Sequence, residues 1–221
     1  LFDNFFQEGI GVPYFFKQSR ESNKRKTNQS VGDIELQVAY EAFPESLYSE
    51  WMPRAFLFSK ITLPTGQSIY ENIIYDGVEI TGQGHASISL GALILKAKGA
   101  YDFQLMAEIH KGLEKRFESR NLHLEPGFGT SALFSLGYTP NNGPWRWGIS
   151  ISPHYEGPKY LTFSNKNLQT DYEFYWDAAA SGSYLYSQKT SFNFSITDQT
   201  ILGPAHNTSL SRTFALNLQK R

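Results

Sequence analysis

Hydrophobic side chains alternate with polar ones along several segments of this chain. In the longest series, the odd-numbered residues are Tyr101, Phe103, Leu105, Ala107 and Ile109. The residues between them are Asp102, Gln104, Met106, Glu108 and His110. Because successive side chains of a β-strand point to opposite faces, this pattern predicts a strand with one apolar and one polar face. Helical spacing of three and four fits the apolar residues poorly, so we predict an all-β fold.

The same period of two recurs from one end of the chain to the other. It is clear in Ile34–Phe43 and Trp145–Glu156. It is weaker in residues 54–64, 86–97, 130–138, 172–186, 192–201 and 210–221, and one further strand is plausible around residues 9–17. Short connections separate 86–97 from 101–113 and 172–186 from 190–201, which predicts two tight antiparallel hairpins.

The connections between these strands fall into two classes. Residues 99–100 and 187–189 are short turns, whereas residues 65–83, 115–126 and 158–170 are long and polar. Short turns at one rim and long loops at the other are typical of outer-membrane barrels. We therefore predict a closed antiparallel up-and-down transmembrane β-barrel of about 10–12 strands. It would comprise residues 31–221, after a partly irregular N-terminal segment, residues 1–30, with room for one strand.

Aromatic residues bracket the apolar face of the Trp145–Glu156 segment. Amphipathic rings settle at the two membrane interfaces, so this placement favours a membrane barrel over a soluble sandwich. The aromatic side chains expected at the interfaces are Trp145, Trp147, Tyr155, Tyr172, Trp176, Tyr184 and Tyr186.

Composition narrows the classes further. The 20 Lys and Arg nearly balance the 21 Asp and Glu, so a nucleic-acid partner is not expected. There is no cysteine, which excludes disulfides and thiolate chemistry. Mean hydropathy is −0.39 and no apolar run is long enough for a membrane helix. The chain starts without a signal-type segment, so we expect a mature outer-membrane protein whose signal peptide has been removed.

Four short motifs resemble those of one family. They are Val31-Gly32-Asp33-Ile34-Glu35-Leu36, Lys60-Ile61-Thr62-Leu63-Pro64-Thr65-Gly66, Thr81-Gly82-Gln83-Gly84-His85 and Glu125-Pro126-Gly127. Their order and spacing, over residues 31–161, are similar to those of the outer-membrane β-barrels of the phenol meta-pathway ("transporter") family. This resemblance implies a barrel in the outer membrane and uptake of hydrophobic or aromatic compounds. It brings no catalytic residues.

The last strand gives a separate indication of the compartment. Leu210, Phe214, Leu216 and Leu218 share one face, and a terminal aromatic at the next position of that face would complete a series that resembles the end of outer-membrane barrels. Lys220 interrupts the apolar series and is interpreted as a residue at the rim. The alternative is an amphipathic edge strand with a basic tail.

Polar residues on the opposite faces of these strands are expected to line the lumen. They are Glu35, Gln37, Glu41, Lys60, Gln104, Glu108, His110, Arg146, His154, Glu156, Glu173 and Asp177. Glu108 with His110 and His154 with Glu156 have a spacing that could serve acid-base chemistry or a metal. We favour charges that pair across strands, since another strand should separate these two. We predict no catalytic residue, no metal and no cofactor.

The function predicted from these features is a channel or uptake protein for small hydrophobic or aromatic compounds. Rings of the long loops would form its mouth, namely Tyr70, Tyr75, Tyr160 and Phe163. The alternatives are a structural or partner-binding barrel of an envelope assembly and a soluble β-sandwich or lipocalin-like binder. Expected partners are outer-membrane lipid and lipopolysaccharide, and a small hydrophobic ligand or an envelope protein complex. A basic cluster near the start of the chain could contact lipopolysaccharide phosphates, a partner or a periplasmic polyanion, but we favour a solvated, mobile N-terminal segment for its residues Lys17, Arg20, Lys24, Arg25 and Lys26.

Overall fold

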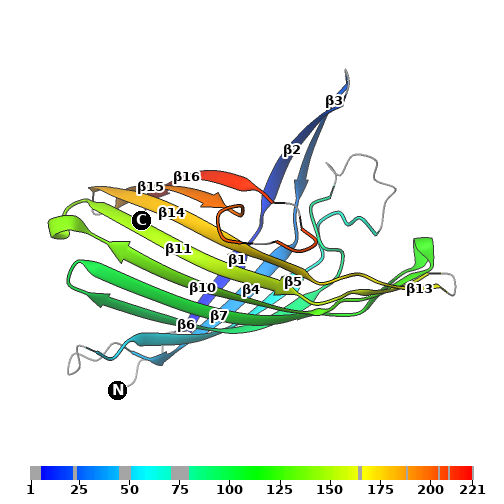
Figure 1. Ribbon diagram of the computed structural model, residues 1–221, viewed down its shortest axis with the longest axis horizontal. Helices are drawn as coiled ribbons and strands as arrows, with labels where there is room; N and C mark the ends of the chain where they lie inside the picture. Colours follow the sequence, from blue (N-terminus) through cyan, green and yellow to red (C-terminus); the bar gives the residue numbers. More distant parts are fainter. Residues whose placement is uncertain are drawn as a thin grey trace.

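The protein consists almost entirely of β-strands (Figure 1). The structure is a computed structural model and describes residues 6–21, 24–44, 51–70, 80–163, 166–187, 189–203, 205–208 and 210–220. The described helical elements are two 3-10 turns, η1 (Glu118–Arg120) and η2 (Pro140–Asn142). Among the described residues, no helix has the length and apolar character to cross a membrane. The all-β prediction is confirmed.

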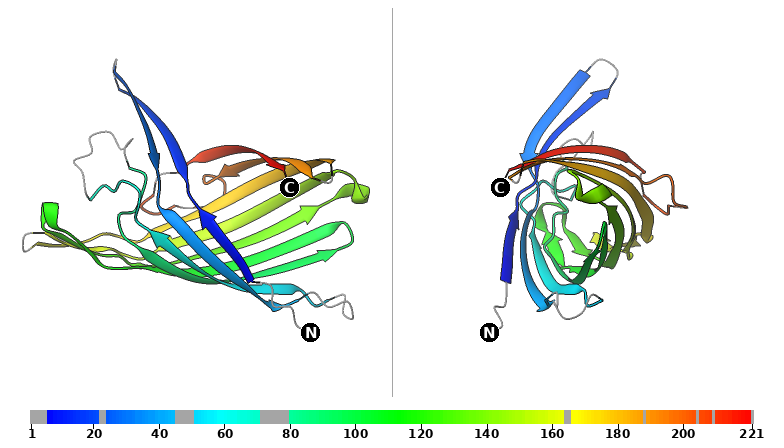
Figure 2. Two further views of the ribbon diagram at one scale, coloured as in Figure 1. Left: turned by 180° about the vertical axis from the view of Figure 1, so that it is seen from behind. Right: turned by 90° about the vertical axis from the view of Figure 1, so that its left-hand side faces the viewer.

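Ten strands form one antiparallel sheet, in the order β1-β4-β5-β6-β7-β10-β11-β14-β15-β16. Figure 2 shows that this sheet curls around a central space, with β1 and β16 as its edges. The strands are β1 (Phe6–Gly11), β4 (Ile34–Phe43), β5 (Arg54–Leu63), β6 (Ser87–Lys98), β7 (Tyr101–Gly112), β10 (Phe128–Tyr138), β11 (Trp145–Glu156), β14 (Glu173–Ser187), β15 (Thr190–Asp198) and β16 (Arg212–Lys220). The up-and-down order and both predicted hairpins are confirmed, and closure stays a prediction.

The two ends of the curled sheet are built differently. At the short-turn rim, Gly99 and Ala100 join β6 to β7, and the six residues 139–144 join β10 to β11. At the long-connection rim, residues 64–86, 113–127, 157–172 and 199–211 connect successive strands of the sheet. The asymmetry expected from the sequence is therefore present.

Two insertions depart from the irregular segments that the sequence predicts. Residues 14–31 form a hairpin of β2 (Tyr14–Glu21) and β3 (Lys24–Val31), which stands away from the sheet (Figure 1). The basic residues of the N-terminal segment lie on this hairpin.

At the long-connection rim, β8 (Lys115–Phe117), β9 (Leu122–Glu125), β12 (Tyr160–Phe163) and β13 (Lys166–Gln169) form a four-stranded sheet in the order β13-β12-β9-β8. The expectation of loops over residues 115–126 and 158–170 was therefore wrong. Strands of three or four residues are too short for alternation to reveal them.

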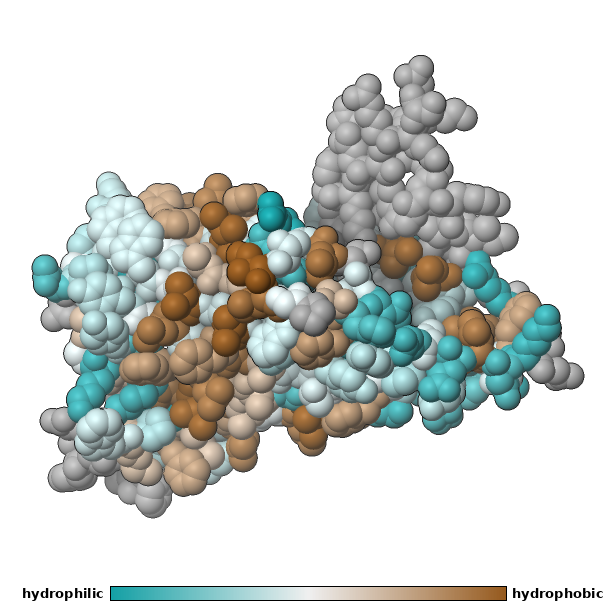
Figure 3. Space-filling view, in the orientation of Figure 1, coloured by the Kyte–Doolittle hydropathy of each residue, from teal (hydrophilic) through white to brown (hydrophobic). Residues whose placement is uncertain are grey.

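The convex face of the main sheet carries large apolar side chains that the fold does not bury. Leu105, Ile149 and Leu216 on this face are 48%, 62% and 88% exposed. Hydrophobic residues gather across the middle of the face seen in Figure 3, and hydrophilic ones gather toward its two ends. The buried apolar cluster lies instead in the small sheet, where Phe117, Leu122 and Leu124 pack together.

Candidate functional site: the polar interior and its mouth

The concave face of the sheet collects the polar residues of the alternating strands. Strand register places Gln37, Lys60, Ser89, His110, Gly129, Glu156 and Glu173 in one row across seven neighbouring strands. The register does not shift between this row and the other residues expected in the lumen, so residues of the same parity share this face. The other residues expected in the lumen lie on the same face: Glu35, Glu41, Gln104, Glu108, Arg146, His154 and Asp177.

Ion pairs join strands that are not direct neighbours. His110 Nε2 of β7 lies 2.5 Å from Glu156 Oε1 of β11, although β10 runs between these strands. The residue of β10 between the two side chains is Gly129, and a Cβ at this position would overlap both of them. Gly137 has the same role nearer the short-turn rim, where Arg146 Nε donates to Asp102 Oδ2 at 2.9 Å. A glycine on the middle strand therefore permits each of these contacts.

Two further contacts between acidic and basic side chains lie on the same concave face. We call the four cross-strand pairs together the ionic belt. Lys60 Nζ of β5 lies 3.1 Å from Glu108 Oε1 of β7, across β6. His154 Nε2 lies 3.0 Å from Asp177 Oδ2 on the adjacent β14, without hydrogen-bond geometry. Opposite charges such as Lys60 and Glu108 stabilise each other when they are paired, which offsets the cost of placing them in a confined interior. Within the described residues, no group of three His, Asp or Glu side chains is placed to hold a metal ion.

A cavity of about 680 Å³ opens inside the curled sheet, toward the long-connection rim. Its wall includes Glu35, Lys60, Glu108, His110 and Glu156, together with residues 80–83 of the connection between β5 and β6. Cavities of this volume hold small molecules. Six of the twelve predicted lumen residues line this cavity, namely Glu35, Lys60, Glu108, His110, His154 and Glu156.

Asp33 anchors the connection between β5 and β6 over the mouth of this cavity. Its buried carboxylate accepts hydrogen bonds from Gly66 N at 2.9 Å and from Gln83 N at 2.7 Å. Thr65 Oγ1 accepts from Ile34 N at 3.0 Å and donates to the Gly32 carbonyl at 2.8 Å. We call residues 64–86 the clamp segment, because these contacts hold its described ends against the start of β4.

His85 belongs to the clamp segment, and its buried ring lies beside Gly112, next to Pro126. Burial lowers the pKa of His85, and nearby Lys159 adds to this, against the hydrogen bond to the Gln83 carbonyl and the charges of Asp33 and Glu156. The four motifs of the family resemblance therefore meet at one place, since Asp33, Gly66, Gln83 and Pro126 come from each in turn. Sequence reasoning did not identify Asp33 or His85 as site residues, and their place within short motifs was the only signal.

The aromatic residues expected at the mouth differ in burial and in the elements that carry them. Tyr70 packs against Phe117 with ring centroids 5.4 Å apart, so it belongs to the apolar cluster of the small sheet. Burial, and then the charge of Glu173, raise its pKa. Tyr160 and Phe163 are exposed but lie in β12, not in an irregular loop as expected. Tyr75 lies outside the described residues.

Aromatic side chains of the convex face form two groups. Near the short-turn rim, Trp145 stacks on Trp147 at 5.7 Å and packs on Tyr184 at 4.7 Å, and Tyr186 lies on the neighbouring strand end. Near the other rim, Tyr155 stacks on Tyr172 at 6.0 Å. Trp176 packs edge-on against Phe174, and these residues lie three residues and one residue after Glu173, where β14 starts.

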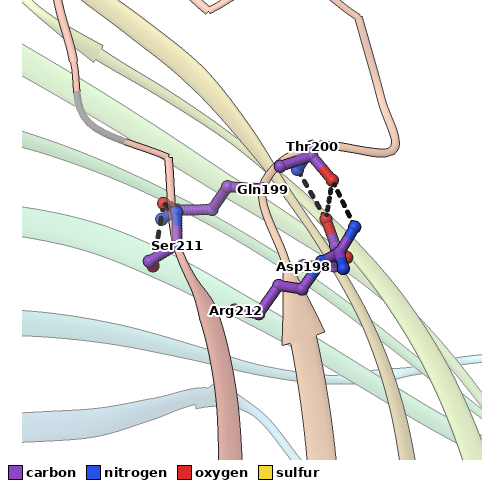
Figure 4. A network of polar contacts seen from close by, with 5 residues as sticks. All are labelled: Asp198, Gln199, Thr200, Ser211 and Arg212. Carbon is purple, nitrogen blue, oxygen red and sulfur yellow. Dashed lines mark hydrogen bonds and ion pairs between the residues drawn. The ribbon is translucent and has the colours of Figure 1, made fainter.

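Polar contacts fasten the last two strands of the sheet at the long-connection rim (Figure 4). The Asp198 carboxylate accepts from Thr200 N at 2.6 Å and lies 2.5 Å from Arg212 Nε. Gln199 Oε1 accepts from Ser211 N at 2.9 Å and from Ser211 Oγ at 3.0 Å. Because Asp198 and Arg212 face outward in register, this network ends the apolar band at that rim.

Comparison with solved structures finds this fold in an outer membrane channel from Pseudomonas putida F1. The match covers 98% of this chain and 84% of that chain, with a TM-score of 0.66 and 13% sequence identity. No family model matches this sequence, and no curated protein matches it. The chain thus has an antiparallel all-β fold that is shared with an outer membrane channel.

Proposed function

We propose that this protein is a β-barrel of the bacterial outer membrane that provides a passage for small hydrophobic or aromatic compounds. The observation that carries this proposal is the distribution of side chains, which is the reverse of that in a soluble protein. Large apolar side chains cover the outer face of the curled sheet, while charged side chains and a cavity of about 680 Å³ lie inside it. The fold shared with an outer membrane channel supports the same proposal.

The exposed apolar side chains of the outer face favour contact with lipid over contact with water. Soluble monomers rarely expose a continuous apolar band of this kind, because water disfavours it. The strands β4 to β7, with 10 to 12 residues each, have the length of membrane-spanning strands. The two aromatic groups on the convex face would then lie at the two interfaces, and pairing of the β1 and β16 edges would close the barrel. These considerations disfavour a soluble sandwich.

One wall of the interior supports an apolar substrate. Register places a strip of inward-facing apolar side chains on β5, β6, β7 and β10: Phe56, Phe58, Leu93, Leu95, Met106 and Leu133. The facing strands β11, β14 and β15 contribute small residues there, such as Ser150, Ala179 and Ser195. Apolar side chains in a lumen are costly in contact with water alone, so a hydrophobic solute that covers them gains free energy.

Membrane insertion is tested by detergent-dependent extraction and by gel migration with and without heating. A closed barrel resists detergent unfolding and migrates differently before and after boiling, because its strands are paired all round. Extraction from the membrane fraction without detergent would contradict the proposal.

Passage is tested with the two methionines of the chain. Met106→Gln places a neutral polar group of similar size in the inner strip and should reduce uptake of a labelled aromatic hydrocarbon by intact bacteria several-fold. Met52→Gln, at an exposed position before β5, is the matched control and should leave uptake unchanged. Equal uptake by both variants and the unchanged protein, at equal surface expression, would argue against passage over this strip.

A structural or partner-binding barrel is the second candidate, and the small sheet at the long-connection rim favours it. Tyr160, Phe163 and Leu168 of this projecting sheet are 48%, 51% and 62% exposed. Exposed rings beyond the barrel could contact lipopolysaccharide or an envelope protein. Pull-down that depends on these three side chains, without any solute flux, would select this candidate.

A further inference from the structure

We propose that the interior cavity selects cationic solutes, and that its preferred ligand is a small organic ammonium ion with an apolar body. This inference rests on the proposed passage function and names the substrate class of that same site. It goes beyond the expectation of an apolar compound, because it assigns the charge that such a compound carries.

Carboxylates outnumber fixed cations around the cavity. Its wall contains Asp33, Glu35, Glu108 and Glu156, whereas Lys60 is the one Lys or Arg side chain among the described residues that line it. Lys60 is engaged with Glu108, His110 is paired with Glu156, and Asp33 is satisfied by neutral backbone N–H groups. In the part of the chain that the structure describes, Glu35 has no ion pair or hydrogen bond, although it faces the cavity. Negative charge in a low-dielectric cavity attracts cations.

Two serines with little exposed surface also line the cavity. Ser89 is 2% exposed and Ser87 is 8% exposed, and both line the cavity. Within the described residues, neither side chain makes a hydrogen bond. Their oxygen lone pairs are therefore open to the cavity, where the N–H groups of an ammonium ion could donate hydrogen bonds to them. These serines therefore point to a ligand independently of the charge.

Apolar groups of the wall fit the body of the same ligand. Met106 and Tyr175 line the cavity beside the carboxylates, and the Tyr175 ring stacks on His154 at a centroid distance of 4.8 Å. An aromatic face next to carboxylates binds an ammonium-bearing solute both by apolar contact and by cation–π attraction. An inorganic cation would use the charge but not these surfaces.

The test compares benzylammonium with benzoate, which are similar in size and opposite in charge. The purified full chain is inserted into planar lipid bilayers, and reversal potentials at pH 7 give the permeability ratio of the two ions. We expect benzylammonium to permeate at least about five-fold better than benzoate. A ratio at or below one, with open channels, would overturn the inference and leave the passage function intact. Absence of any conductance would overturn both.

Variants identify the groups responsible. Glu35→Gln should lower the ratio about two-fold, whereas Glu118→Gln, an equal charge change at an exposed residue of η1, should leave it unchanged. Ser89→Ala should lower benzylammonium permeability relative to K⁺ by a similar factor. If Glu35→Gln and Glu118→Gln behave alike, the cavity carboxylates do not set the selectivity and the inference fails. If the permeability of benzylammonium relative to K⁺ is the same in Ser89→Ala as in the unchanged protein, the assignment of an ammonium ligand fails.

Discussion

The chain reverses its direction at both rims of the curled sheet, but the connections at the two rims are stabilised by different contacts. At the short-turn rim, Gly99 takes a positive φ of 61° and the turn from β6 to β7 needs only two residues. At the long-connection rim, residues 64–86 return to the sheet through contacts with Asp33, which is more than 30 positions away from Gly66 in the sequence. One rim is held by local backbone geometry, and the other by long-range hydrogen bonds.

This difference indicates which rim carries the features that could bind a solute. In the part of the chain that the structure describes, the short-turn rim adds to the strands only turns and the 3-10 turn η2. The long-connection rim carries the clamp segment, the small sheet and the open side of the cavity. Loops on a rigid scaffold tolerate variation and commonly carry binding residues. We therefore expect changes in solute selection to follow the long-connection rim.

The largest effect should come from Asp33→Ala. Loss of the carboxylate leaves the Gly66 and Gln83 N–H groups without their acceptor, which should cost about 3 kcal/mol of local stability. Hydrogen exchange at these two amides should become faster by two orders of magnitude, while exchange in β6 and β7 stays slow. The control is Asp171→Ala at the same rim, where the side chain is 62% exposed. Unchanged exchange in Asp33→Ala would show that the rim does not depend on this anchor.

An intermediate effect is expected where glycine separates an ion pair. Gly137→Ala should destabilise the protein by about 2 kcal/mol, because the new methyl group displaces both Asp102 and Arg146. Gly129→Ala should cost about 1 kcal/mol, because the His110 and Glu156 pair is held by a single hydrogen bond.

Urea unfolding followed by tryptophan fluorescence measures both differences between these glycine variants. If Gly129→Ala lowers the free energy of unfolding more than Gly137→Ala does, the His110–Glu156 pair near the long-connection rim stabilises the protein more than we expect.

The smallest effect concerns pH. Burial lowers the pKa of His85 in the folded protein, so the unfolded form, with a pKa of about 6.5, binds a proton more readily. The contribution of neutral His85 is therefore complete above about pH 6.5 and is lost as the pH falls through the folded pKa. Protease cleavage within the clamp segment should be about two- to five-fold faster at pH 5 than at pH 7.5. His85→Gln should remove this pH dependence, and its persistence in that variant would assign it to another group.

Much of the main sheet could be predicted from the sequence because its information is local. Alternation in Tyr101–Gly112 already separates Leu105 from Gln104, and the structure places these residues on opposite faces of β7. A strand of this length contains its whole pattern, and a shift by one residue would exchange its two faces. Strand bounds, hairpin partners and the polar set of the concave face follow from this property.

The candidate site could be predicted only in part. The sequence separated His110 from Glu156 by an intervening strand and so disfavoured their contact, yet the absence of a side chain at Gly129 brings them together. Likewise, β8, β9, β12 and β13 are too short to show a period, and they form a sheet only because segments distant in sequence meet there.

The sequence by itself determined which residues form the long strands and which face each side chain takes, since a period of two acts within a few residues. The tertiary structure alone decided that three of the short motifs meet at the Asp33 anchor, through Asp33, Gly66 and Gln83, and that carboxylates from β4, β7 and β11 share one cavity. Those contacts depend on the order of strands and on the curl of the sheet. Both arise from pairing along the whole chain, which no local pattern encodes.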